Sequence, residues 1–107
     1  QTCALPIFVL SDYTITDQIT LFHRAKIIVG AHGSGLNNLL FCTPNTTIIE
    51  IFQGRSDCCF YYLSQLVKAK YFPIQTVDFT TIDGREKTTT PLFLIEQFIQ
   101  QHKDIFL

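Results

Sequence analysis

The fold is decided by the stretch Ile27-Ile28-Val29-Gly30-Ala31-His32-Gly33-Ser34-Gly35-Leu36, in which a β-branched run passes into a glycine-rich turn. A continuous apolar run of this kind is typical of a strand buried on both faces of a parallel sheet. The turn leads into a segment, residues 35–41, that can form a short helix. We therefore interpret the stretch as a strand-to-helix junction in an α/β domain.

Working outward from this junction, helical and extended patterns alternate along the chain. Alternation of this type predicts parallel strand pairing with right-handed crossovers, so the expected fold is a Rossmann-like layered parallel sheet spanning residues 8–107. The predicted helices cover residues 14–26 and 57–68 and a last segment that opens at Thr90-Pro91. The predicted strands are residues 8–10, 47–52 and 70–77, with Pro73 favouring an edge position for the last, and Asp83-Gly84 marks a turn in a polar loop.

Composition excludes several classes of protein. The chain has 107 residues, enough for one domain, and its net charge of -1 with 8 scattered Lys and Arg residues argues against nucleic-acid binding. Its apolar runs are too short to span a membrane. The four cysteines fit neither a disulfide framework nor a C-x-x-C metal site, so we interpret them as small apolar residues in a reduced chain. They are Cys3, Cys42, Cys58 and Cys59.

The amino-terminal segment has an unusual character. The chain begins with Gln1 and contains no methionine, and residues 1–7 resemble a translated short-read sequencing adapter. An ordinary loop with one proline is the alternative interpretation. We exclude residues 1–7 from the expected fold, and we expect the chain to be a piece of a longer protein whose cellular compartment the sequence leaves open.

The glycine-rich turn is the strongest candidate for a functional site. In open α/β sheets, ligands bind at the carboxyl ends of the strands, and the free N–H groups of a following helix attract anions. A phosphate or diphosphate suits such a turn, with His32, Ser34 and either Asn37 or Asn38 as polar partners. The alternative is a glycine-rich turn that serves as a tight connection alone.

Three sharper motifs are absent from this turn. A dinucleotide fingerprint starting at Gly33 requires glycine at position 38, which is Asn38. A nucleophile elbow centred on Ser34 requires glycines at positions 32 and 36, which are His32 and Leu36. No Gly-Lys-Ser/Thr sequence of a Walker loop occurs. Neither NAD nor serine-hydrolase chemistry is therefore expected.

A wider pattern around the turn resembles the C-terminal half of the catalytic domain of glycosyltransferase family 61. The resemblance covers roughly residues 14–75, and it departs from the family at Asp17, where glutamate is commoner. The residues that carry it are Asp17-Gln18-Ile19, Leu21-Phe22, Ala25, the run from Ile27 to Leu36, Asn38, Phe41, Pro44 and Ile49-Glu50.

The resemblance implies the C-terminal, donor-binding half of a two-domain GT-B enzyme whose N-terminal domain lies outside this chain. Such an enzyme transfers a sugar, with inversion, from a nucleotide diphosphate such as UDP to a hydroxyl of a glycan or protein. The resemblance also implies a metal-independent reaction with no cofactor, in keeping with the absence of an Asp-x-Asp triplet. The compartment is the cytoplasm for a bacterial protein and the Golgi or endoplasmic reticulum lumen for a eukaryotic one.

The resemblance also suggests roles for individual residues. His32 is the candidate for stabilising the leaving diphosphate, and Glu50, expected at the carboxyl end of its strand, is the candidate for bonding ribose or sugar hydroxyls. The alternatives are that His32 caps the turn and that Glu50 is a solvated or structural carboxylate. A non-catalytic Rossmann-like binding or interaction module is the alternative for the whole chain. The donor-binding candidates are Gly33, Ser34, Gly35, Leu36, Asn38 and Glu50.

Overall fold

The computed structural model describes residues 7–53, 57–76, 79–82, 85–88 and 92–106. Apart from Ile7, the segment 1–7 for which we expect a non-native origin lies outside these residues. The predicted turn at Asp83-Gly84 and the predicted helix start at Thr90-Pro91 also lie outside them.

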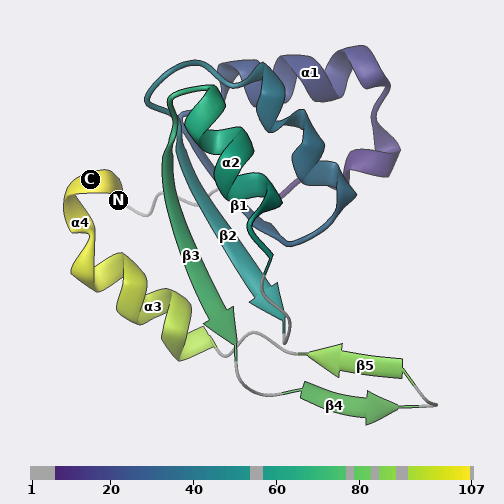
Figure 1. Cartoon of the computed structure of the whole chain (residues 1–107), viewed down its shortest axis with the longest axis vertical. Coiled ribbons are helices and arrows are strands. Elements are labelled where there is room, and N and C mark those ends of the chain that lie inside the picture. Colours follow the sequence, from purple (N-terminus) through teal and green to yellow (C-terminus); the bar gives the residue numbers. More distant parts are fainter. Residues whose placement is uncertain (1–6, 54–56, 77–78, 83–84, 89–91, 107) are drawn as a thin grey trace.

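A three-stranded parallel sheet forms the centre of the molecule (Figure 1). Its strands are β1 (Ile27–Ala31), β2 (Thr47–Gln53) and β3 (Lys70–Thr76), in the order β1-β2-β3. Both pairings are parallel, with Gly30 opposite Glu50 and Glu50 opposite Pro73. The predicted Rossmann-like α/β class is confirmed, and so is the edge position of the strand that contains Pro73 among the described strands.

Helices cover the two faces of the sheet unequally. On one face, α1 (Ile15–Arg24), the 3-10 helix η2 (Ser34–Phe41) and α2 (Cys59–Leu66) enclose the main apolar core. On the other face, α3 (Leu92–Gln101) packs Phe98 against a second, smaller cluster. The main core consists of Phe22, Leu36, Leu39, Cys42, Ile48 and Phe60, and the second cluster of Ile49, Ile51 and Ile74.

Local sequence accounts for the main helix of the amino-terminal part. The Thr14 side chain accepts a hydrogen bond from the Asp17 N–H at 3.1 Å, so it caps α1 as its position in the sequence predicts. Asp17 adds negative charge to the first turn, and His23 and Arg24 add basic groups to the last, in keeping with the helix dipole. Phe22 is the side chain of α1 that reaches the core.

The first strand is less buried than the sequence predicts. Val29 is 41% exposed. It lies in β1, the outermost strand of the described sheet, whereas α3 packs over β2 and β3. An apolar groove of about 990 Å³ runs along this uncovered part, lined by residues that include Ile27, Val29, Ile51 and Phe98. The expectation of burial on both faces is therefore wrong for β1.

Two further expectations differ from the structure. Residues 8–10 do not form a strand, and the 3-10 helix η1 (Leu10–Asp12) follows at once. The polar loop instead contains an antiparallel pair, β4 (Phe79–Ile82) and β5 (Arg85–Thr88). β-branched threonines favour the extended state there despite their polarity. A short helix, α4 (Lys103–Phe106), follows α3.

Only one of the described cysteines behaves as a small apolar core residue. Cys42 is buried in the main core, whereas Cys58 and Cys59 are exposed at the start of α2. All three are free thiols, as expected for a reduced chain. Within the described part of the chain, no helix is long and apolar enough to cross a membrane.

Two adjacent leucines of η2 test the main core. Leu39 is fully buried and Leu40 is 52% exposed. We expect Leu39→Ala to lower the free energy of unfolding by about 2–5 kcal/mol, because it removes apolar contacts and leaves a cavity. Leu40→Ala is the matched control and should change it by less than about 0.5 kcal/mol. Urea unfolding of both variants measures this, and equal losses would contradict the core described here.

Alkaline pH tests the burial of Cys42. Burial raises the pKa of its thiol from 9.0 to about 11. Between these values the unfolded chain loses the thiol proton while the native state keeps it, so the free energy of unfolding falls as pH rises. We expect the urea concentration at the midpoint of unfolding to decrease between pH 9.0 and about pH 11. Cys42→Ala should make this decrease smaller. Cys58→Ala, at an exposed position, should leave the decrease unchanged.

Candidate functional site

The glycine-rich turn lies at the carboxyl edge of the parallel sheet. The His32 backbone N–H donates to the Ile51 carbonyl at 2.9 Å, which continues the β1–β2 ladder by one residue. Gly33 follows in an extended conformation and is the N-cap residue of η2, which begins at Ser34. The chain therefore passes directly from strand to helix at this point. His32 precedes the first residues of η2, whose backbone N–H groups have no partner within the helix.

The glycines of this stretch serve two different purposes. A Cβ added at Gly30 would lie 3.1 Å from Cδ2 of buried Leu36, and one added at Gly35 would lie 2.9 Å from Cδ1 of Leu10. Both glycines therefore allow close packing. At Gly33 the nearest atom to an added Cβ, the Ala31 carbonyl oxygen, is 3.9 Å away, so space is open beside this residue. Gly33 is the glycine past which a ligand can approach the backbone.

A hydrogen-bond network joins His32 to the interior of the sheet. His32 Nδ1 donates to Glu50 Oε2 at 2.6 Å, and the Tyr71 hydroxyl donates to Glu50 Oε1 at 2.5 Å. The Glu50 side chain is fully buried, whereas the His32 side chain is 34% exposed. Because Glu50 takes the Nδ1 hydrogen, the other ring nitrogen of His32, Nε2, is available for a ligand.

Glu50 does not lie where the sequence predicts. It is the fourth residue of the seven in β2, not the last, and protein groups occupy both of its carboxylate oxygens. Direct bonding of Glu50 to ribose or sugar hydroxyls stays an untested prediction, and this geometry instead favours a role through His32. Burial, together with the hydrogen bond to Glu50, raises the pKa of Tyr71 above its ordinary value, so its hydroxyl keeps the proton that it donates.

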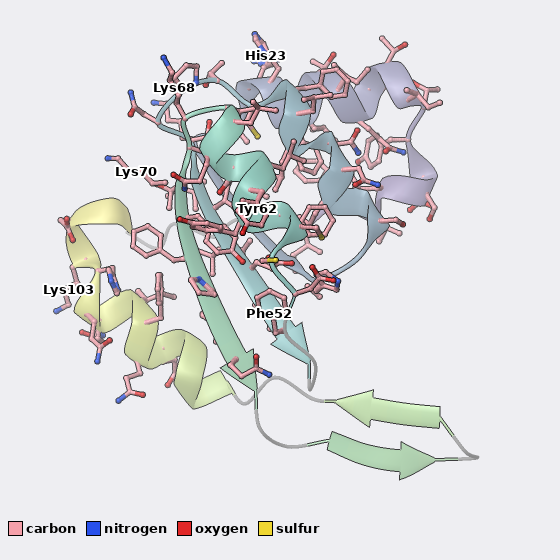
Figure 2. All side chains as sticks on the ribbon, in the orientation of Figure 1. His23, Phe52, Tyr62, Lys68, Lys70 and Lys103 are labelled. Carbon is pink, nitrogen blue, oxygen red and sulfur yellow. The ribbon has the colours of Figure 1, made fainter. Side chains whose placement is uncertain are left out.

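Aromatic rings hold the imidazole on two sides. The His32 ring stacks on Phe52, with ring centroids 5.4 Å apart and planes inclined by 26°. Its centroid lies 5.3 Å from that of the Phe60 ring. Figure 2 shows Phe52 near the carboxyl end of β2, beside the turn. These contacts and the bond to Glu50 restrict the rotation of His32, so its free nitrogen has a defined direction before any ligand binds.

The remaining predicted donor-binding residues have different surroundings. Ser34 is exposed at the start of η2, whereas Leu36 belongs to the main core. Asn38 is turned towards α1, and its amide donates to Gln18 Oε1 at 3.0 Å and to the Gly35 carbonyl at 3.2 Å. The structure therefore brings His32, Gly33 and Ser34 together at the turn, and places Leu36 and Asn38 in packing and helix-joining roles.

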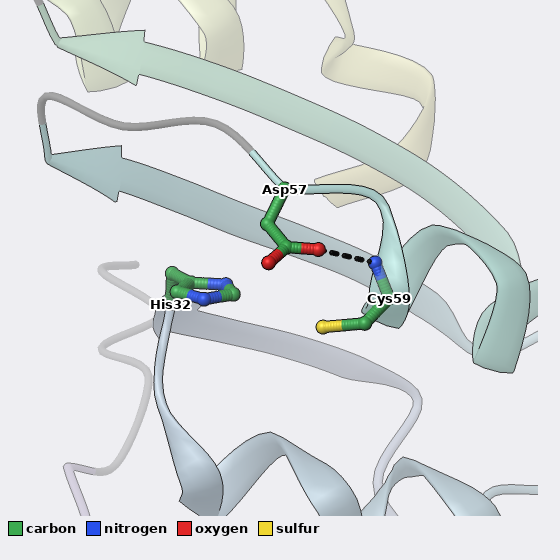
Figure 3. A group of neighbouring side chains, drawn as sticks. All are labelled: His32, Asp57 and Cys59. Carbon is green, nitrogen blue, oxygen red and sulfur yellow. Dashed lines mark hydrogen bonds between the residues drawn. The ribbon is translucent and has the colours of Figure 1, made fainter.

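Three ionisable side chains around His32 are not identified as site residues by sequence reasoning. Besides Tyr71, they are Asp57 and Cys59, which face His32 from the start of α2 (Figure 3). Asp57 Oδ1 accepts a hydrogen bond from the Cys59 backbone N–H at 2.9 Å, which lowers the pKa of the carboxyl. Partial desolvation, followed by the charge of Asp57, raises the pKa of the Cys59 thiol. The Asp-x-Cys spacing is the one available signal, and it is too common to identify a site.

Basic side chains of the sheet region lie at its other edge. Arg24 and Lys26 come just before β1, and Figure 2 shows Lys68 and Lys70 at the amino end of β3. Among the described side chains of the sheet and its loops, His32 is therefore the basic group at the carboxyl edge. An anion bound at the glycine-rich turn would meet His32 rather than a lysine or arginine of these segments.

Comparisons with known proteins relate the chain to glycosyltransferases. Residues 2–49 match the family model described as Glycosyltransferase 61. The chain is 27% identical over 92 residues to the rat (Rattus norvegicus) EGF domain-specific O-linked N-acetylglucosamine transferase, which covers 78% of this chain and 18% of that protein. It is 45% identical over 42 residues to the Arabidopsis thaliana beta-1,2-xylosyltransferase, which covers 39% of this chain and 8% of that protein. No solved structure matches the chain. The chain thus spans less than a fifth of the length of these relatives.

Two tyrosine-to-phenylalanine changes test the buried network. Tyr71→Phe removes the donor to a fully buried carboxylate, so we expect it to lower the free energy of unfolding by about 1.5–3 kcal/mol. Tyr62→Phe, at a side chain that is 65% exposed, is the matched control and should have an effect below about 0.5 kcal/mol. Urea unfolding measures both. A Tyr71→Phe variant as stable as the control would show that Tyr71 does not support Glu50 in solution.

Proposed function

We propose that the chain, whose residues 2–49 match the model of glycosyltransferase family 61, forms the donor-binding part of an inverting glycosyltransferase. The proposed donor is a nucleotide diphosphate sugar, with UDP as the nucleotide. The proposed acceptor is a hydroxyl group of a glycan or protein, and the name of one relative states an O-linked transfer.

The observation that carries this proposal is the position of His32. It stands at the carboxyl edge of a parallel sheet, beside the open backbone of Gly33 and the first turn of η2. In open α/β sheets this edge binds ligands, and the N–H groups of a helix start favour a negatively charged one. The site therefore suits the diphosphate of a sugar donor.

The proposed chemistry is stabilisation of the leaving group. As the bond between the sugar and the diphosphate breaks, negative charge grows on the phosphate oxygens, and groups that donate hydrogen bonds to them lower the barrier. In the protonated ring of His32, Nδ1–H donates to Glu50 and Nε2–H is available to the diphosphate. Glu50 then acts through His32, holding its orientation and balancing its charge.

Magnitudes favour His32 over the helix terminus as the main contributor. A helix dipole stabilises a charge by about 0.3–2 kcal/mol, depending on exposure. A single well-placed donor in a catalytic site contributes about 2.7–4 kcal/mol to the barrier. The fixed position of His32, between Phe52 and Phe60 and against Glu50, supports the larger value because little reorganisation is needed during the reaction.

The proposal includes the architecture of the whole enzyme. In a GT-B enzyme the donor-binding domain faces a second Rossmann-like domain across a cleft, and the acceptor and further catalytic groups come from that domain. We propose that the transfer needs no metal, since the sequence has no Asp-x-Asp triplet to hold a divalent ion against the diphosphate.

Substitution of His32 in the full protein tests the proposed function. We expect His32→Ala to lower transfer from the UDP-sugar donor by about ten- to a thousandfold, because the leaving diphosphate loses its donor. His23→Ala, at an exposed position on α1, is the matched control and should retain wild-type activity. Steady-state kinetics with the UDP-sugar, after circular dichroism has verified folding, provide the measurement.

The same variants separate the enzyme from a binding module without activity. Isothermal titration of UDP into the wild-type protein should give saturable binding that His32→Ala weakens. Absence of UDP binding in the folded wild-type protein would favour a non-catalytic Rossmann-like module, and unchanged turnover in His32→Ala would refute the role of His32.

A further inference from the structure

The geometry points to a second ligand for His32: we propose that His32, Asp57 and Cys59 form a three-residue binding site for Zn²⁺ at the carboxyl edge of the sheet. One potential ligand atom from each residue lies within 4.8 Å of the other two (Figure 3). The three side chains come from separate parts of the fold, since His32 follows β1 and the other two lie at the start of α2.

The three groups are the types of ligand that zinc prefers. Imidazole nitrogen, thiolate sulfur and carboxylate oxygen are its usual protein ligands, and three of them with a fourth open position form a common tetrahedral site. Magnesium and calcium instead require mostly oxygen ligands, and the thiolate disfavours them. The composition of the cluster therefore selects a thiophilic, borderline-soft divalent metal.

The distances allow such a site after a small closure. With zinc bonds of about 2.0–2.3 Å, ligand atoms in a tetrahedral site lie roughly 3.3–3.8 Å apart. The side chains of His32, Asp57 and Cys59 are all exposed to some extent, and none is held in the packed core. Rotation of the exposed Asp57 and Cys59 side chains towards the fixed His32 ring can therefore supply the closure of about 1 Å, without movement of the strands.

Surrounding hydrogen bonds prepare the ligands. Histidine ligands of metals commonly donate their other ring N–H to a carboxylate, which fixes the tautomer and makes the ligand more basic. Glu50 provides this bond to His32 Nδ1 at 2.6 Å, leaving the Nε2 lone pair for a metal. Asp57 Oδ1 is held by the Cys59 N–H at 2.9 Å, which keeps the carboxylate beside the thiol and leaves its other oxygen available.

Cobalt substitution tests the site directly. Co²⁺ titrated into the purified full protein should give the intense visible bands of four-coordinate cobalt and a thiolate-to-metal charge-transfer band, and Zn²⁺ should remove both. We expect Cys59→Ser to abolish the charge-transfer band and Asp57→Asn to weaken binding at least about tenfold. Cys58→Ser is the matched control, because this neighbouring thiol is exposed but outside the cluster, and it should keep the band.

Two results would overturn the proposal. One is a folded wild-type protein that shows no charge-transfer band at saturating Co²⁺. The other is a band that Cys58→Ser removes as fully as Cys59→Ser, since both cysteines would then act as unspecific surface thiols. All three substituted side chains are exposed, so circular dichroism should show wild-type folding in each variant.

One consequence of the site rests on the proposed function. The ring nitrogen that binds zinc cannot at the same time donate to a diphosphate, so saturating Zn²⁺ should weaken UDP binding at least about tenfold. Titration of UDP with and without Zn²⁺ measures this effect. If the cobalt spectra identify the site while zinc leaves UDP affinity unchanged, the metal site stands and the proposed role of His32 in donor binding fails.

Discussion

The rest of the candidate site depends on one buried carboxylate, that of Glu50 in the middle strand. Removing a charged group from water is costly unless its hydrogen bonds are replaced. Here His32, directly after β1, and Tyr71, in β3, replace them. Both bonds require the register in which Glu50 lies opposite Gly30 and Pro73. A shift of β1 or β3 by one residue would turn the partner away, so the network and the sheet register stabilise each other.

This constraint also determines what His32 can do. With Nδ1 bonded to Glu50 and the ring held by Phe52 and Phe60, one nitrogen is left for chemistry at the edge of the sheet. That nitrogen can donate to an anion when it carries a proton and can bind a metal when it does not. The proposed donor site and the proposed zinc site therefore share one ring, and occupation of one state excludes the other.

Local patterns in the sequence account for much of this fold. The cap at Thr14, the run Ile27-Ile28-Val29 and the position of Pro73 each act over a few residues, so helix α1, the parallel sheet and its edge strand are predictable. The network is not, because Tyr71 and His32 meet Glu50 through strand pairing between distant segments. The same holds for Asp57 and Cys59, which reach His32 because α2 starts beside the turn.

The uncovered side of β1 has a consequence for how the chain behaves in solution. Among the described residues β1 has β2 as its one neighbouring strand, so its other side presents a row of peptide groups next to an apolar groove. Such a surface can pair with the same strand of a second molecule. The other edge strand, β3, contains Pro73, which has no backbone N–H and therefore cannot donate a hydrogen bond to an added strand. Self-association should therefore begin at β1, rise with protein concentration and disappear when another segment covers that strand.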